Sequence, residues 1–190
     1  MTGTSIRIDA EGEQIRRRLE ELRRSFDADV SAAPCEDTER TAGFLLLTLS
    51  GEAYALAVAH ALEILEVPTI VPLPGVPPSV LGIINFRGQI LSVTTIHRVL
   101  GLAGGGQKAR SKIIVTKDLP LFTGILVDGV DGIVEVRVGD IQPIAATVKD
   151  DRTRLLAGQV YVGERLVSLL DMEQLCRSES LRVAPADGVN

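Results

Sequence analysis

The side chains that most often carry catalysis or bind metal ions are scarce and widely separated in this chain. Its two histidines, His60 and His97, lie far apart, and no HExxH motif provides the spacing of a helical zinc site. Cys35 and Cys176 form no CxxC pair, and neither has a histidine close by in sequence that could activate a thiol. No Gly-x-Ser-x-Gly motif prepares a nucleophilic serine. These patterns predict a protein that is not an enzyme and uses no metal or cofactor.

Two further patterns resemble ligand-binding loops only superficially. The glycine run at residues 104–106, followed by Lys108, lacks the GxxxxGK[ST] spacing of a phosphate loop and follows a helix-like segment rather than a strand. We interpret residues 103–110 as a loose, flexible connection. Three acids lack the spacing of a calcium-binding EF-hand and are expected to be solvated turn residues: Asp128, Asp131 and Asp140.

Charge and composition disfavour several classes of partner. The net charge of −5 and the aromatic content of 3% remove both the basic footprint and the stacking side chains of a nucleic-acid-binding protein. No apolar run is long enough to span a membrane, and residues 16–18 are arginines where the apolar core of a signal peptide would lie. With the isolated cysteines, these features predict a cytoplasmic protein. The 45% hydrophobic content with 18 glycines favours a β-rich core with tight turns.

Residues 1–42 differ from the rest of the chain in being polar and highly charged. Within them, residues 13–27 carry apolar side chains at intervals of four, three and four, which predicts one stripe of an amphipathic helix. The stripe consists of Ile15, Leu19, Leu22 and Phe26. Such a helix either packs on its own domain or docks on a partner, and the sequence alone leaves both open.

A weak internal repeat organises the remainder of the chain. A shift of 69 residues places the strand-like run 44–46 on 113–115, and a shift of 76 places Gly82 on Gly158. Each copy is predicted to form a strand, a turn, two strands, an extended connector and a hairpin, and the first connector is the proline-rich segment 68–79. About five short strands in each copy predict an all-β fold of two small barrels side by side, because a closed barrel has no exposed sheet edge.

The hairpin of each copy is expected to turn at a glycine, with residues 88–89 and 163–164 at the centres of type II′ turns. Short helices are expected at residues 95–100 and 171–182. Arg87 stands on the shoulder of the first hairpin. Its guanidinium is planar and permanently charged. At this position it is either an ordinary exposed group or an anchor that binds a partner or a loop.

At this hairpin the sequence resembles the CheW family of chemotaxis coupling proteins, and the similarity covers residues 43–176. The motifs that carry it are Tyr54-Ala55-Leu56, Ala61-Leu62-Glu63-Ile64, Pro72-Leu73-Pro74-Gly75, Gly82-Ile83-Ile84-Asn85-Phe86-Arg87-Gly88, Leu126-Val127-Asp128-Gly129-Val130, Ala157-Gly158 and Leu169-Leu170-Asp171. The resemblance implies two SH3-like five-stranded β-barrels in residues 43–176, with residues 1–42 as an N-terminal extension and 177–190 as a C-terminal tail.

The resemblance also implies a function. Such a protein is a non-enzymatic signal-transduction adaptor without a cofactor. It links the cytoplasmic tips of chemoreceptors to the regulatory domain of a CheA-type histidine kinase, a domain of the same fold. Neither nucleic acid binding nor direct insertion into the membrane is implied, so the chain would meet the membrane only through receptor arrays.

Individual site residues follow from the same resemblance. The positions that match the family's receptor-binding groove, an apolar groove suited to a receptor helix, are Ala61, Gly82, Asn85, Arg87, Gly88 and Val130. The positions that match a surface contacting kinase and receptor are Glu63 and Ile64.

The chain departs from the family pattern after the first hairpin. Where the family usually has Pro-Val-x-Asp-Leu, Ser92 and Thr95 stand at the proline and aspartate positions. Ala61 also replaces what is commonly a larger aliphatic residue. These departures leave a second interpretation open. The chain would then be a regulatory or decoy module of a dedicated chemosensory pathway, binding only one partner through the helix predicted at residues 13–27.

Overall fold

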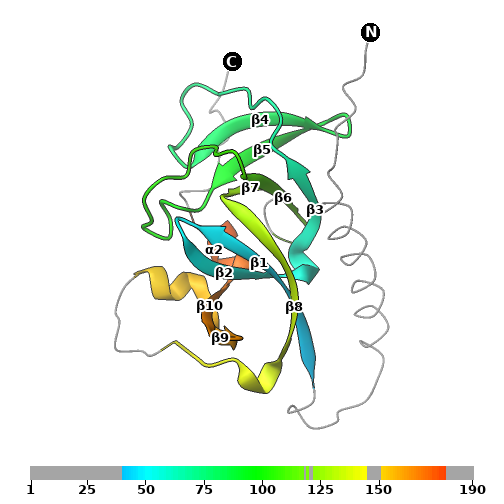
Figure 1. Ribbon diagram of the computed structural model, residues 1–190. Coiled ribbons are helices and arrows are strands. Elements are labelled where there is room, and N and C mark those ends of the chain that lie inside the picture. The colour runs from blue at the N-terminus through cyan, green and yellow to red at the C-terminus, as the bar shows by residue number, and fades with distance from the viewer. Residues whose placement is uncertain (1–39, 118, 120–121, 145–150, 179–190) are drawn as a thin grey trace.

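The computed structural model describes residues 40–178 apart from 118, 120–121 and 145–150 (Figure 1). The described residues are mostly in strands, which confirms the predicted all-β fold. The strands are β1 (Thr41–Leu49), β2 (Glu52–Ala57), β3 (Ala61–Glu66), β4 (Val80–Phe86), β5 (Gln89–Thr95), β6 (Lys112–Thr116), β7 (Gly124–Val127), β8 (Gly129–Arg137), β9 (Leu156–Val162) and β10 (Arg165–Leu170). The helical elements are the short 3-10 helices η1 (Val58–His60), η2 (Val138–Asp140) and η3 (Asp151–Leu155), and the α-helix α2 (Met172–Arg177).

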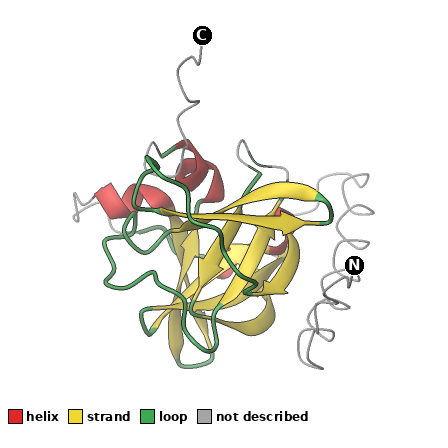
Figure 2. Cartoon of the chain, turned by 90° about the horizontal axis from the view of Figure 1, so that it is seen from above, coloured by secondary structure: helices red, strands yellow, loops and turns green. Residues whose placement is uncertain are grey.

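The strands form two five-stranded sheets, as predicted. Sheet A has the order β8-β1-β2-β10-β9, and sheet B has the order β3-β6-β7-β5-β4. Hydrogen-bonded neighbours are antiparallel except β2 with β10 and β5 with β7. Each sheet curls round a core to which all five of its strands contribute, so each has the form of a small barrel. Figure 1 shows sheet B above sheet A, and Figure 2 shows the long loops gathered on one side of the strands.

The strand order shows how the internal repeat is arranged in space. If β1 to β5 are replaced by β6 to β10, and the reverse, the order of sheet A becomes the order of sheet B. This arrangement differs from the simplest expectation of one barrel for each copy, because each sheet takes two strands from one copy and three from the other. Each copy divides after its second strand: η1 leads the chain from β2 into sheet B, and the β7–β8 turn leads it back into sheet A.

Two equivalent glycines have the same physical role in the two copies. A Cβ atom at Gly82, on β4, would collide with the carbonyl oxygen of Val71, because the extended connector crosses β4 there and pairs with it. A Cβ atom at Gly158, on β9, would lie 2.9 Å from the carbonyl oxygen of Gln142, where the second connector makes the equivalent bridge. The match between these glycines in sequence therefore reflects a close backbone approach in each barrel.

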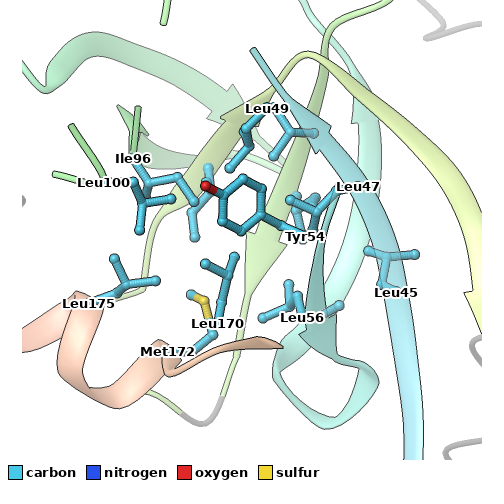
Figure 3. Packing of buried hydrophobic residues seen from close by; sticks show 14 of the residues in the cluster. Leu45, Leu47, Leu49, Tyr54, Leu56, Ile96, Leu100, Leu170, Met172 and Leu175 are labelled. Atoms are coloured by element: carbon cyan, nitrogen blue, oxygen red, sulfur yellow. The ribbon is translucent and has the colours of Figure 1, made fainter. Parts of the chain in front are cut away.

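A third hydrophobic cluster joins the two barrels. It contains side chains from β1, β2, β6, β7, β10 and α2, and Tyr54 lies near its centre in Figure 3. Strand β1 sends Leu45 and Leu47 into this shared cluster and Phe44 and Leu46 toward the core of sheet A. Burial of both faces explains why β1 is continuously apolar rather than alternating.

Several predicted connections are corrected by the structure. Residues 95–100 do not form a helix, because β5 continues to residue 95 and a tight turn follows in which the Leu100 amide donates to the Ile96 carbonyl. The loop at residues 103–110 is not loose, since its Ala103 carbonyl accepts from Ser50 and its Lys108 side chain donates to Asp128. The expected C-terminal helix is present as α2, and the side chain of Asp171 caps it by accepting from the Gln174 amide.

Two further features bear on the predictions. The helix predicted at residues 13–27, with Ile15, Leu19, Leu22 and Phe26, lies outside the described residues, as does the tail beyond residue 178. Among the residues that the structure describes, no helix has both the length and the apolar character needed to cross a membrane.

Candidate functional site

The β4–β5 hairpin turns one residue earlier than the sequence predicted. Phe86 pairs with Gln89, so the two central residues are Arg87 and Gly88, with φ angles of 51° and 84°. Positive φ at both central positions is characteristic of a type I′ turn. Glycine is strongly favoured at the second of these positions, which Gly88 occupies here. The prediction that residues 88–89 form the centre of this turn is therefore wrong by one residue. In the second hairpin Val162 pairs with Arg165 and Gly163 has a φ of 61°, so residues 163–164 are central as predicted.

Arg87 occupies a backbone conformation that a residue with a side chain rarely adopts. The left-handed region costs such a residue about 1–2 kcal/mol relative to its usual conformations. The neighbouring Asn85 supports the turn, because its Oδ1 accepts a hydrogen bond of 2.8 Å from the Gly88 amide. Backbone strain of this kind often marks a residue whose side-chain direction matters, and at Arg87 it accompanies a specific contact.

The contact is an ion pair between Arg87 and Glu63. Arg87 Nη2 donates to Glu63 Oε2 at 2.5 Å, and the Arg87 guanidinium also lies 5.2 Å from the centre of the Phe86 ring. Glu63 is only 5% exposed, whereas the Arg87 side chain is 65% exposed. Glu63 is on β3 and the hairpin belongs to β4 and β5, at the opposite end of the strand order of sheet B. The ion pair therefore connects the two ends of that sheet.

A shallow apolar depression adjoins the hairpin. It measures about 350 Å³ and is lined by Thr69, Val71, Ile83, Ile84, Asn85, Gly88, Gln89 and Ile90. Two of these side chains are unusually exposed for their type, Ile90 at 78% and Val71 at 55%. Neither residue was predicted as part of a site, although the alternation of β5 about buried Leu91 places Ile90 on the outer face. Exposed apolar side chains grouped around a depression are typical of an interaction surface.

The structure separates the predicted site residues by burial. Three of them are exposed together at the hairpin: Asn85, Arg87 and Gly88. Three are buried: Ala61, Gly82 and Glu63. Ile64 and Val130 are partly buried and pack on the cluster between the barrels. Glu63, Asn85, Arg87 and Gly88 therefore form one constellation, while Ala61 belongs to the shared core and can affect a partner only through packing.

Sheet A carries a related ion pair between the equivalent parts of the fold, although not at the equivalent residues. Asp131, on β8, lies 3.6 Å from Arg165, on β10, and accepts a hydrogen bond of 2.9 Å from Thr48. Strands β8 and β10 are the repeat equivalents of β3 and β5, so each barrel has an acid on an outer strand paired with an arginine of its hairpin. The exposed side chains of Tyr161 and Leu166 face each other across this hairpin. Asp131 is thus a paired strand residue rather than a solvated turn acid.

A polar cluster lies where β7 passes into β8. Asp128 accepts 2.7 Å hydrogen bonds from Lys108 Nζ and from the Ser50 amide. Burial of the Asp128 carboxylate raises its pKa, but these two hydrogen bonds and the adjacent His97 ring outweigh that effect, and the pKa falls below its ordinary value of 3.8. His97 is 0% exposed, so its ring lies wholly inside the fold. Asp128 is likewise a partnered acid rather than a solvated one.

The cluster continues inward as a chain of polar contacts. Thr95 Oγ1 lies 2.9 Å from His97 Nδ1, and His97 Nε2 lies 3.3 Å from Asp128 Oδ1; both Thr95 and His97 are buried. Ser92 and Thr95, the two departures from the family pattern, both use their hydroxyl groups internally, Ser92 toward Thr123. Within the described part of the chain, no three His, Cys, Asp or Glu side chains gather to hold a metal ion.

Comparisons with known proteins agree with this architecture. The family described as "CheW-like domain" matches residues 43–180. The chain is 25% identical to "Chemotaxis protein CheW" of Helicobacter pylori over 144 residues, covering 76% of this chain and 87% of the relative. It is 31% identical to "Chemotaxis protein CheW" of Thermotoga maritima over 131 residues, covering 69% of this chain and 85% of the relative.

A solved structure shares the fold. The scaffolding protein TtCheW from Thermoanaerobacter tengcongensis superposes with a TM-score of 0.68 at 21% sequence identity. The superposition covers 76% of this chain and 99% of that one. The two-barrel arrangement is therefore the same, and nearly the whole of the solved relative is matched by this chain.

Proposed function

The chain belongs to the CheW-like domain family, as its motifs predicted, and we propose that it is an adaptor coupling methyl-accepting chemoreceptors to a CheA-type histidine kinase. Its relatives are described as chemotaxis proteins, and the solved relative as a scaffolding protein. A chemotaxis scaffold is thus the general function. The identity of the two partners, and the residues that bind them, are the proposal.

The pairing of Arg87 with Glu63 carries the proposal. A guanidinium has five N–H donors in one plane, and Glu63 holds one side of that plane from within the barrel. The rest of the Arg87 side chain faces solvent at 65% exposure. A strained turn and a buried carboxylate therefore fix an exposed donor group before any partner arrives. Such preorganisation reduces the entropy lost on binding.

The receptor surface that we propose consists of this anchor and its apolar surroundings. The Arg87 guanidinium and the side-chain amide nitrogen of Asn85 can donate to carbonyl or carboxylate oxygens of a receptor helix, while the Gly88 amide holds the Asn85 side chain in place. Val71 and Ile90 supply exposed apolar area beside them. Among the other members of the predicted groove, Gly82 lies directly under the connector that carries Val71, whereas Ala61 and Val130 belong to the cluster between the barrels and act only through packing.

A second surface is needed for an adaptor, and the chain offers two places for it. Ile64, beside Glu63 on β3, matches the family's kinase- and receptor-contacting positions. The β9–β10 hairpin of sheet A repeats the arrangement of an arginine, its acidic partner and exposed apolar side chains. Because the two hairpins belong to different barrels, one can bind the receptor while the other meets the regulatory domain of the kinase.

The single-partner alternative has less support. It depends on the helix predicted at residues 13–27, which lies outside the described residues. The departures at Ser92 and Thr95 motivated it, yet both side chains are accommodated inside the fold. The coupling function also places the chain in the cytoplasm, where the receptor tips and the kinase are found.

Binding of the purified full chain to its two partners tests the proposal. The probes are a receptor cytoplasmic hairpin and a CheA regulatory domain from the same genome, each measured by calorimetry, and the mixture of all three by gel filtration. We expect affinities on the order of micromolar for each pair, typical of exchangeable contacts, and one complex that contains all three proteins. Binding to neither partner would refute the function, and binding to only one would favour the regulatory or decoy module.

A further inference from the structure

The loop between β5 and β6, residues 101–111, crosses the polar cluster around Asp128. We call this loop the strap. Its glycines provide unusual backbone angles, with φ of 63° at Gly101, 91° at Gly104 and 97° at Gly105. It has few buried apolar side chains, since most of its residues are exposed. A segment of this composition opens at low free-energy cost unless specific contacts hold it.

Three contacts hold the strap closed over the buried His97. Gly105 packs so tightly that a Cβ atom there would lie 2.7 Å from Thr95 Oγ1. The Ser50 hydroxyl, from the β1–β2 turn of sheet A, donates to the carbonyl of Ala103. Lys108 Nζ donates to Asp128 Oδ2 at 2.7 Å. The strap connects two strands of sheet B. It is held by Ser50 of sheet A and by Asp128, which lies where the chain passes from sheet B to sheet A.

The closed arrangement also contains unfavourable features. His97 Nε2 and Asp128 Oδ1 lie 3.3 Å apart and are both buried without a well-formed hydrogen bond, although the nearby His97 ring helps to lower the pKa of Asp128. Ser50 has a φ of 52°, the left-handed region that disfavours a residue with a side chain. Opening would let water hydrate the two buried atoms, so their burial favours the open state. The hydrogen bond from Lys108 to Asp128 favours the closed state.

We propose that the strap is a two-state element whose closed state is fastened by the Lys108–Asp128 ion pair, and that its opening exposes His97 without unfolding either barrel. Lys108 suits this role because its side chain is 52% exposed while the carboxylate it holds is only 9% exposed. Solvent conditions act directly on the Lys108 end of the pair, so added salt weakens the closed state. The proposal concerns the free chain and does not depend on the adaptor function.

Hydrogen exchange of the full chain without partners tests the strap. The reporting amides are those of Leu102, which donates to the His97 carbonyl at 2.7 Å, and Lys108, which donates to Ser111 Oγ at 2.8 Å. We expect Lys108→Ala to speed exchange at both amides by roughly tenfold, the effect of losing a hydrogen bond to a charged group. Amides of β2 should keep their wild-type exchange rates. The matched control is Arg177→Ala, which removes a 57% exposed cationic partner of an acid, Glu173, within α2.

A second pair of variants changes the strap backbone instead of its charge. Gly105→Ala places a methyl group against Thr95, whereas the neighbouring Gly106 has open space around it and no positive φ. We expect Gly105→Ala to speed exchange at the Leu102 and Lys108 amides and Gly106→Ala to leave it unchanged. Unchanged strap exchange in both Lys108→Ala and Gly105→Ala would overturn the proposal. Equal acceleration of strap and β2 amides would also overturn it, because the whole fold would then be opening.

Discussion

Arg87 Nη2 and Glu63 Oε2 lie 2.5 Å apart although one residue is in an exposed turn and the other is on a strand that is buried at that position. They are 24 residues apart in sequence, and β3, which carries Glu63, is adjacent to neither strand of the β4–β5 hairpin. The contact thus closes sheet B and orients the guanidinium at the same time, so stability and recognition are expected to respond differently to changes at Arg87.

For stability, we expect Arg87→Ala to lower the free energy of unfolding by about 1–2 kcal/mol. The exposed ion pair itself contributes little, but its loss removes the Arg87 charge that faces the buried Glu63 carboxylate. Arg87→Gly should be less harmful than Arg87→Ala by about 1 kcal/mol, because glycine adopts the φ of 51° without strain. Urea unfolding of the two variants measures this order, and a reversed order would contradict the strained turn.

For recognition, we expect Arg87→Ala to weaken binding of the receptor hairpin by about 1–3 kcal/mol, because an arginine that is held in place before binding is a typical hot spot. Calorimetry with the isolated receptor hairpin provides the measurement. Arg137→Ala is the control, since Arg137 is an exposed arginine at the end of β8 in the other sheet. If both variants bind as tightly as the wild type, Arg87 is an ordinary exposed side chain.

Gly82→Ala is expected to destabilise the protein by more than about 2 kcal/mol. Its Cβ atom would meet backbone atoms of Val71, which cannot move without breaking the bridge to Ile83, and its φ of 147° is also unfavourable for alanine. Gly139→Ala is the matched control, because Gly139 has open space around it and no positive φ. Thermal unfolding should show a large loss for the first variant and a change within about 0.5 kcal/mol for the second.

Acid should weaken the fold partly through Asp128. The pKa of Asp128 is lowered in the folded protein, so the unfolded chain binds the proton more readily. The stabilisation is therefore complete at neutral pH, above the ordinary pKa of 3.8, and it is lost as the pH falls through the lower folded pKa. In Asp128→Asn we expect lower stability at pH 7 and a shallower decline below pH 4, measured by urea unfolding at a series of pH values. A decline as steep as that of the wild type would contradict the role of Asp128.

Removal of residues 1–39 distinguishes the two functional interpretations. An adaptor that binds through its barrels keeps both partners after this truncation, and we expect that result. A single-partner module that binds through the helix predicted at residues 13–27 loses its partner. Pull-down of the receptor hairpin and of the kinase regulatory domain by the truncated chain gives the answer, with circular dichroism as the check on folding.

The elements were predictable where local chemistry decides them. The repeat could be detected because Gly82 and Gly158 are each required by a crossing connector, and such a requirement leaves a mark in sequence. The centre of the first hairpin was misplaced by one residue because the tertiary contact to Glu63 keeps Arg87 in a conformation that sequence preferences assign to glycine. A local sequence pattern cannot reveal that the backbone strain at Arg87 is offset by its ion pair with Glu63, which is distant in sequence.

The candidate site was only partly predictable for a related reason. Asn85, Arg87 and Gly88 are neighbours in sequence and their exposure follows from the hairpin. The burial of Ala61 and the partners of Asp128 depend on which sheet each strand joins, and this is decided by η1 and by the β7–β8 turn. The aliphatic runs of β1 and β6 are compatible with pairing within their own copy or with strands of the other copy. The exchange of strands between copies is therefore visible only in the three-dimensional structure.

The division of each repeat between the sheets has a consequence for synthesis on the ribosome. Strands β3 to β7 are contiguous in the chain, so sheet B has all its strands once residue 127 has emerged. Sheet A combines the first two strands with the last three and waits for β10, which ends at residue 170. We therefore expect β1 and β2 to be held unpaired, or paired only with each other, while sheet B forms. In that interval their exposed apolar edges are the part of the nascent chain most in need of a chaperone.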